Sequence, residues 1–203
     1  MAGTKFFPTR IRDMILAALF AAIVAVLSQL SVPVPISPVP ITGQVLGVFL
    51  AGGILGARLG SLSLLLYVLL GAIGLPLFAG ARGGFTVLVG PTGGYIWGFI
   101  VGSYILGKIV DVLQNARMGA YARTALGMCG CLVAVYALGT IQLAIVLGIS
   151  FSKALAIGVL PFVPLDVAKL VAATVLSVAV RQALVSAKIL EKSCKDIRTP
   201  GPR

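Results

Sequence analysis

The fold follows from residues 14–30, which read MILAALFAAIVAVLSQL. The segment carries no charged side chain, and about 20 such residues form a helix that spans the hydrocarbon core of a bilayer. Basic residues ahead of an apolar segment are also typical of a secretory signal peptide, and Lys5, Arg10 and Arg12 precede this one. Because further apolar segments follow directly, we expect a permanent first membrane helix.

Similar apolar segments recur along most of the chain. Of the 203 residues, 59% are hydrophobic and 10% are charged, whereas a soluble domain carries about 25% charged residues. This composition excludes an ordinary cytosolic globular protein. We predict one all-α integral membrane domain, residues 1–203, that crosses the cell membrane several times. The six predicted spans cover residues 14–30, 42–57, 59–75, 95–110, 124–149 and 164–184.

The positive charges fix the expected orientation of these spans. Six spans place both termini on the same side of the membrane. Of the 16 lysine and arginine residues, only Arg82 and Lys153 then fall on the opposite side, while Lys169 lies within a span. Because basic loops stay in the cytoplasm, both termini and the basic tail 185–203 are predicted to be cytoplasmic. Basic residues of the cytoplasmic loops, which fix the orientation of the chain in the lipid bilayer, explain the net charge of +11. We therefore expect no nucleic-acid partner.

Three unusual segments fall on the predicted outer side. Residues 31–40 read SVPVPISPVP, and proline removes backbone donors and disfavours helix, so we predict an extended or irregular loop. Residues 76–94 read PLFAGARGGFTVLVGPTGG, where glycine permits tight turns and close backbone approach to a ligand. This segment is either a flexible external loop or, given its apolar side chains, partly buried. The third segment, residues 161–169, reads PFVPLDVAK.

Asp166 and Lys169 form the most informative pair in the sequence. They are three residues apart, so one helix face carries both side chains. Ionisable residues at membrane depth are costly and are usually functional. The pair is either a structural ion pair or a polar site at the mouth of a pocket. A carboxylate accepts N–H groups and an ammonium group donates to a carbonyl, which suits a small ligand with both donors and acceptors.

The sequence offers no catalytic or metal site. It has no histidine, and Cys129 and Cys131 sit in an apolar run where they pack as small hydrophobic residues. It also lacks the G-x-x-x-x-G-K-[ST] phosphate loop. We therefore expect neither enzymatic activity nor a cofactor.

Small residues at four-residue spacing predict close helix contacts in two spans. The first span has Ala17, Ala21 and Ala25, and the fourth has Gly94, Gly98 and Gly102. We expect the glycines to pack against another helix of this chain. The alanines could equally face another protein.

Four motifs carry a family resemblance that covers about residues 12–185. They are PISPVPITGQ at 35–44, GAIGLPLFAG at 71–80, GPTGGY at 90–95 and PFVPLDVAK at 161–169. Together, and in this order, they resemble BioY, the biotin-binding substrate-specific component (S component) of energy-coupling factor (ECF) transporters.

The resemblance implies a six-helix S-component fold with biotin bound near the outer surface, under the loops. It implies that Asp166 and Lys169 contact the polar head of biotin. The residues that it places near the ligand in the loop and the following helix are Phe78, Gly83, Gly84 and Tyr95. It further implies that the alanine stripe docks on the ECF transmembrane coupling protein. ATP hydrolysis is then expected on separate ATPase subunits.

The sequence departs from the family pattern at two places. Leu165 stands where a glycine usually precedes the aspartate, and Ala81-Arg82 follows Gly80 where the family reads nearer FAGG. Arg82 is then an added cation at the outer mouth, which either pairs with the carboxylate of biotin or is a solvated loop charge. Two other functions stay open: an S component for another small vitamin, and a membrane assembly protein that transports nothing.

Overall fold

The computed structural model describes residues 9–187, 189 and 190, and it is mostly helical. Most of the predicted basic tail 185–203 lies outside the described residues. In chain order the elements are α1 (Thr9–Gln29), β1 (Ser31–Val34), β2 (Ser37–Thr42), α2 (Gln44–Leu50), the π-helix η1 (Ala51–Leu55), α3 (Gly56–Ala72), α4 (Phe85–Val89), α5 (Gly93–Val112), the 3-10 helix η2 (Leu113–Asn115), α6 (Ala120–Leu147), α7 (Phe151–Gly158) and α8 (Val163–Ser186).

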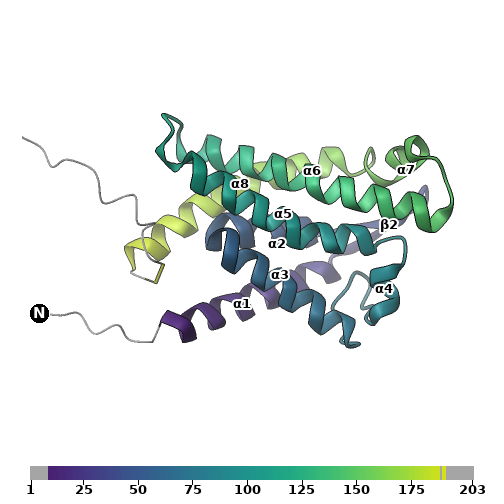
Figure 1. Cartoon of the computed structure of the whole chain (residues 1–203), viewed down its shortest axis with the longest axis horizontal. Helices are drawn as coiled ribbons and strands as arrows, with labels where there is room; N and C mark the ends of the chain where they lie inside the picture. Colours follow the sequence, from purple (N-terminus) through teal and green to yellow (C-terminus); the bar gives the residue numbers. More distant parts are fainter. Residues whose placement is uncertain (1–8, 188, 191–203) are drawn as a thin grey trace, which may run out of the picture.

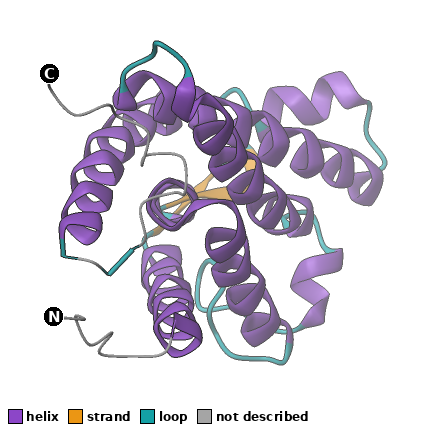
Figure 2. Ribbon diagram, turned by 60° about the vertical axis from the view of Figure 1, so that its left-hand side comes forward, coloured by secondary structure: helices purple, strands orange, loops and turns teal. Residues whose placement is uncertain are grey.

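The long helices lie side by side along the longest axis of the molecule (Figure 1). One end of this bundle holds the two strands, α4 and α7, and we call it the loop end. At the opposite end α1 begins and α8 ends. Figure 2 shows the helices arranged around the two strands.

Five helical stretches among the described residues are long and apolar enough to cross a membrane. They are Ile11–Gln29, Gln44–Ala72, Gly93–Val112, Ala120–Leu147 and Val163–Ser186. A helix of 20 residues is about 30 Å long, which matches the hydrocarbon core of a bilayer. The chain is therefore a membrane protein with several apolar helices.

The stretch Gln44–Ala72 is not one straight helix, because the chain reverses direction inside it. Gly56 has φ +82° and ψ −174°, a backbone conformation that only glycine adopts readily. A Cβ atom on Gly60 would lie 2.8 Å from the carbonyl oxygen of Ala51, so α3 folds back against η1. The predicted boundary between residues 57 and 59 therefore corresponds to a real turn, while the π-helix before it was not predicted.

The proline-rich segment forms an antiparallel hairpin, which corrects the expectation of a purely helical chain. Ser31 pairs with Thr42, Val32 with Ile41 and Val34 with Ser37, with a register shift between Val32 and Val34. A sheet of two strands consists only of edges, where the missing N–H group of proline is tolerated. The segment is extended, as predicted, but it is hydrogen-bonded and not irregular.

The glycine stripe packs against α6, as expected. A Cβ atom on Gly98 would lie 2.8 Å from the Cα atom of Val135, and one on Gly102 would lie 2.7 Å from the sulfur of Cys131. Backbones of α5 and α6 thus approach closely, as small residues allow in lipid.

The alanine stripe on α1 has a different environment from the one predicted. Ala17 and Ala21 are 3% and 4% exposed, because α1 packs against α2 and α3. These two residues therefore belong to the interior of the chain and cannot form a docking surface in this structure. The outward face of α1 carries Ala18 and Ala22, and Ala25 is half-buried.

Candidate ligand-binding site

A cavity opens at the loop end of the bundle. It holds about 600 Å³ of space between atoms, a figure that includes space open to solvent. Its walls come from β2, α2, the loop after α3, α4, and from α5, α6 and α8 with the residues just before α5 and α8. The lining residues are Val39, Pro40, Thr42, Gln44, Val45, Phe78, Ala79, Arg82, Val87, Thr92, Tyr95, Ile96, Phe99, Val135, Tyr136, Phe162, Asp166 and Lys169.

Asp166 and Lys169 lie together on the wall that α8 contributes. Asp166 sits in the first turn of α8, where the partial positive charge of the helix end favours a carboxylate. Its Oδ1 accepts from Nζ of Lys169 at 2.7 Å, and the residue is 3% exposed. The predicted pair therefore exists as an ion pair, and both of its members line the cavity.

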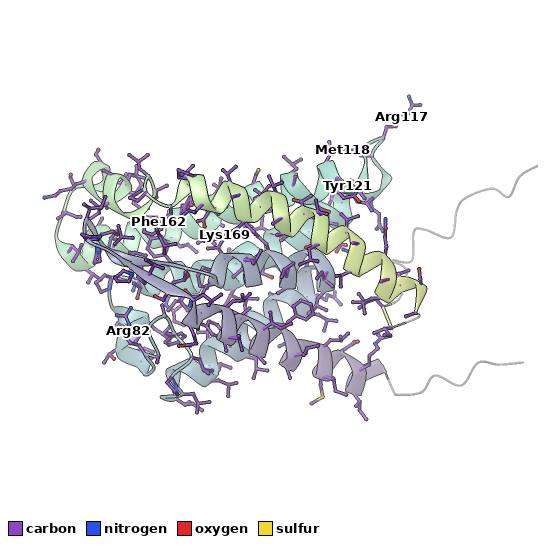
Figure 3. All side chains as sticks on the ribbon, turned by 180° about the vertical axis from the view of Figure 1, so that it is seen from behind. Arg82, Arg117, Met118, Tyr121, Phe162 and Lys169 are labelled. Atoms are coloured by element: carbon purple, nitrogen blue, oxygen red, sulfur yellow. The ribbon has the colours of Figure 1, made fainter. Side chains whose placement is uncertain are left out.

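Two further elements hold this ion pair. The hydroxyl of Tyr136, on α6, donates to Oδ2 of Asp166 at 2.7 Å. Lys169 donates a second hydrogen bond to the carbonyl oxygen of Thr42, on β2, at 2.8 Å. The pair thus joins α8 to α6 and to the hairpin. Figure 3 shows Lys169 within the bundle, toward the end of the molecule that also carries Phe162 and Arg82.

The pair keeps bonding capacity for a ligand. An ammonium group has three N–H donors, and described residues accept two of those of Lys169. A carboxylate has about four lone-pair sites, and described donors occupy two of those of Asp166. The two interpretations of the sequence, a structural ion pair and a polar site at a pocket, are therefore compatible. The two charges neutralise each other within the chain, and the pair also borders a cavity with unused donors and acceptors.

A second polar chain lies beside the pair. The side chain of Thr42 donates to Oε1 of Gln44 at 3.0 Å, and Nε2 of Gln44 donates to the hydroxyl of Tyr67 at 2.7 Å. Tyr67 in turn donates to the carbonyl oxygen of Leu77 at 3.1 Å. Gln44 is buried and lines the cavity. The sequence contains a signal for it, because Gln44 ends the motif PISPVPITGQ.

Aromatic rings form much of the apolar wall. Phe78 is 1% exposed and meets the ring of Tyr67 edge-on, with centroids 5.6 Å apart. Tyr95 donates its hydroxyl to the carbonyl oxygen of Gly158 at 2.8 Å, which ties α5 to the end of α7. Phe78 and Tyr95 both line the cavity, in agreement with the positions near the ligand that we expected for them.

Gly83 and Gly84 do not line the cavity, in contrast to the expectation. Gly84 has φ +98° and donates its N–H to the carbonyl oxygen of Gly71 at 2.7 Å. A Cβ atom on Gly83 would overlap the carbonyl group of Leu75. Both glycines instead let the loop turn back closely over the end of α3.

Arg82 reaches the cavity from a tight loop. Phe78 and Arg82 exchange backbone hydrogen bonds of 2.8 and 3.3 Å, and Ala81 between them has φ +56°, which is uncommon for a residue with a side chain. Nε of Arg82 donates to the carbonyl oxygen of Ala79 at 3.0 Å. This bond uses one of the five guanidinium donors at the edge of the cavity.

These features define an integral membrane protein with a ligand-binding cavity at one end of a helical bundle. A model of the BioY family matches residues 2–186. The chain therefore belongs to the BioY family, which confirms the resemblance found in its motifs.

Known proteins with similar sequences or structures support the same family assignment. The chain is 43% identical to the "Biotin transporter BioY" of Rhizobium etli over 177 residues, covering 83% of this chain and 92% of that protein. It is 40% identical to the "Biotin transporter BioY" of Thermotoga maritima, covering 84% of this chain and 96% of that protein. A crystal structure of the "S-component for biotin from an ECF-type ABC transporter" superposes with a TM-score of 0.80 at 26% identity, covering 90% of this chain and 95% of that one.

Lys169→Met is expected to destabilise the ligand-free protein. It leaves the buried carboxylate of Asp166 without its countercharge, a loss that costs about 3–5 kcal/mol. The matched control is Lys153→Met, because Lys153 is exposed on α7. Thermal unfolding in detergent should show a lower Tm for Lys169→Met and an unchanged Tm for Lys153→Met. The Asp166→Asn/Lys169→Met double variant should recover most of the lost Tm. Equal stability of all four proteins would contradict the ion pair.

Proposed function

We propose that this chain is the biotin-specific S component of an ECF-type transporter and that it captures biotin in the cavity at the loop end. One observation carries the proposal: a buried carboxylate, paired with a half-buried ammonium group, borders a cavity with unused donors and acceptors. Membership of the BioY family and the names of the relatives support biotin as the ligand.

The chemistry of biotin matches the residues of the cavity. Its ureido ring has two N–H donors and one carbonyl acceptor. We infer that Asp166 accepts from the ring N–H groups and that Lys169 donates to the ring carbonyl. The sulfur-containing ring and the aliphatic tail are apolar, and Phe78, Tyr95 and Phe162 offer them an aromatic wall. Gly83 and Gly84 act indirectly in this proposal, by shaping the loop.

Arg82 is proposed to pair with the carboxylate at the far end of biotin. Its guanidinium lies at the cavity edge with donors to spare, and guanidinium groups bind carboxylates strongly through paired hydrogen bonds. The ligand would then be held at both polar ends.

We further propose that the whole chain forms one membrane domain with six passes. The reversal at Gly56 supports counting Gln44–Ala72 as two passes, and an even number fits α1 beginning where α8 ends (Figure 1). Among the described basic residues, Arg82 and Lys153 belong to the loop end, while Arg12 near the start of α1 and Arg181 near the end of α8 belong to the opposite end. This asymmetry supports cytoplasmic termini and a cavity that faces the outside of the cell membrane.

We also propose that the energy for uptake comes from other subunits. We propose that the chain docks on an ECF transmembrane coupling protein, which links it to ATPase subunits. The outward face of α1 is the candidate contact, with Ala18 and Ala22 in place of the buried Ala17 and Ala21.

The purified full-length protein is expected to bind biotin saturably at sub-micromolar concentration. Asp166→Asn should weaken binding at least about 30-fold, because it removes one member of a buried charged pair. Asp111→Asn is the matched control, since Asp111 pairs with Arg181 far from the cavity. Isothermal titration calorimetry measures both. Binding of another vitamin in place of biotin would identify a different S component, and no binding of any vitamin would favour an assembly protein.

Arg82→Ala is expected to weaken biotin binding about 10-fold, because a hydrogen bond to a charged group contributes about 1.5–3 kcal/mol. Biotin amide lacks the negative charge, so its affinity should hardly change in the variant. Lys153→Ala controls for the general loss of a positive charge at the loop end. If biotin binds Arg82→Ala as tightly as wild type, Arg82 is a solvated loop charge.

A further inference from the structure

Tyr136 is a cavity residue for which the sequence predicted no role. It lies on α6, thirty positions before Asp166, and its hydroxyl donates to Oδ2 of that residue at 2.7 Å. Lys169 occupies the other oxygen, Oδ1, at 2.7 Å. Two donors from two different helices therefore hold one carboxylate.

This arrangement restricts a group that is otherwise free to turn. The carboxyl group of an aspartate rotates in a broad torsional well. The ammonium group of Lys169 comes from the same helix and is carried by a long, flexible side chain, so it restrains this rotation little. Tyr136 adds a short, rigid connection from α6, which itself packs against both α5 and α8. With both oxygens bound, the plane of the carboxylate is fixed relative to the cavity that all three residues line.

We propose that Tyr136 is a positioning residue for biotin binding: it fixes the Asp166 carboxylate so that its remaining lone pairs meet the N–H groups of the ureido ring. The inference rests on the proposed function. Tyr136 acts through Asp166, and its own contact with the ligand is not required. Preorganisation of this kind raises affinity because the ligand no longer has to order the group that binds it.

The test compares Tyr136→Phe with the matched control Tyr104→Phe, whose ring lies on the exposed face of α5. Tyr136→Phe should weaken biotin binding about 10-fold, the value of a hydrogen bond to a charged group, and Tyr104→Phe should leave it unchanged. Desthiobiotin keeps the ureido ring but lacks the sulfur ring, so it should lose the same factor. A loss confined to biotin would show that the Tyr136 hydroxyl contacts the sulfur ring directly, and would overturn the proposal.

A double-mutant cycle checks that the effect passes through Asp166. In the Asp166→Asn background, Tyr136→Phe should change biotin affinity by less than about twofold, because residues that act through one interaction are not additive. The same 10-fold loss in both backgrounds would contradict a positioning role.

A ligand-free measurement separates this inference from the proposed function and does not depend on weak binding. Tyrosine labelled with 13C at Cζ reports the hydrogen bond of each hydroxyl by NMR, and the signal missing from Tyr136→Phe belongs to Tyr136. Asp166→Asn should shift that signal and leave those of the other tyrosines in place. If the Tyr136 signal shifts in Asp166→Asn but the wild-type protein does not bind biotin, the proposed function is wrong while the hydrogen bond between Tyr136 and Asp166 is supported. An unshifted signal in a protein that does bind biotin overturns the inference alone.

Discussion

A carboxylate buried among membrane helices has to be neutralised and hydrogen-bonded, and the loop end of this protein is organised around that requirement. Removing an ionised group from water costs several kcal/mol even after relaxation, so partners must come from the surrounding elements. Asp166 obtains them from Lys169 on α8 and from Tyr136 on α6, and Lys169 in turn binds the carbonyl of Thr42. One acid thereby fixes the relative positions of two helices and the hairpin.

The hairpin and the loop after α3 depend on similar local bonding. Irregular backbone near membrane depth is stable only where protein or a cavity satisfies its polar groups. The carbonyl of Leu77 accepts from Tyr67 and from Ser28, so the loop is tied to both α3 and α1. Gln44 links Tyr67 to Thr42, which connects this group to the ion pair through the hairpin. The cavity is therefore bordered by backbone that a continuous polar network holds in place.

Much of this organisation could be predicted from the sequence. The apolar runs predicted the positions of the long helices, and the spacing of Asp166 and Lys169 placed both on one helix face, because such features are local in the chain. The hairpin was missed, since four prolines argue against a strand unless both strands are edges. Tyr136 was missed because its partner is far away in sequence and only tertiary packing brings them together. For the same reason the interior and exterior faces of α1 could not be distinguished at Ala17 and Ala21.

The central claim is that the Asp166 and Lys169 pair recognises the polar ring of biotin from within the cavity. The structure of the protein with bound biotin tests it most directly. The account predicts the ureido nitrogens and oxygen within hydrogen-bond distance of Asp166 and Lys169, about 2.7–3.2 Å, with the carboxylate toward Arg82. Biotin bound elsewhere, or bound here with its ring away from an undisturbed ion pair, would contradict it.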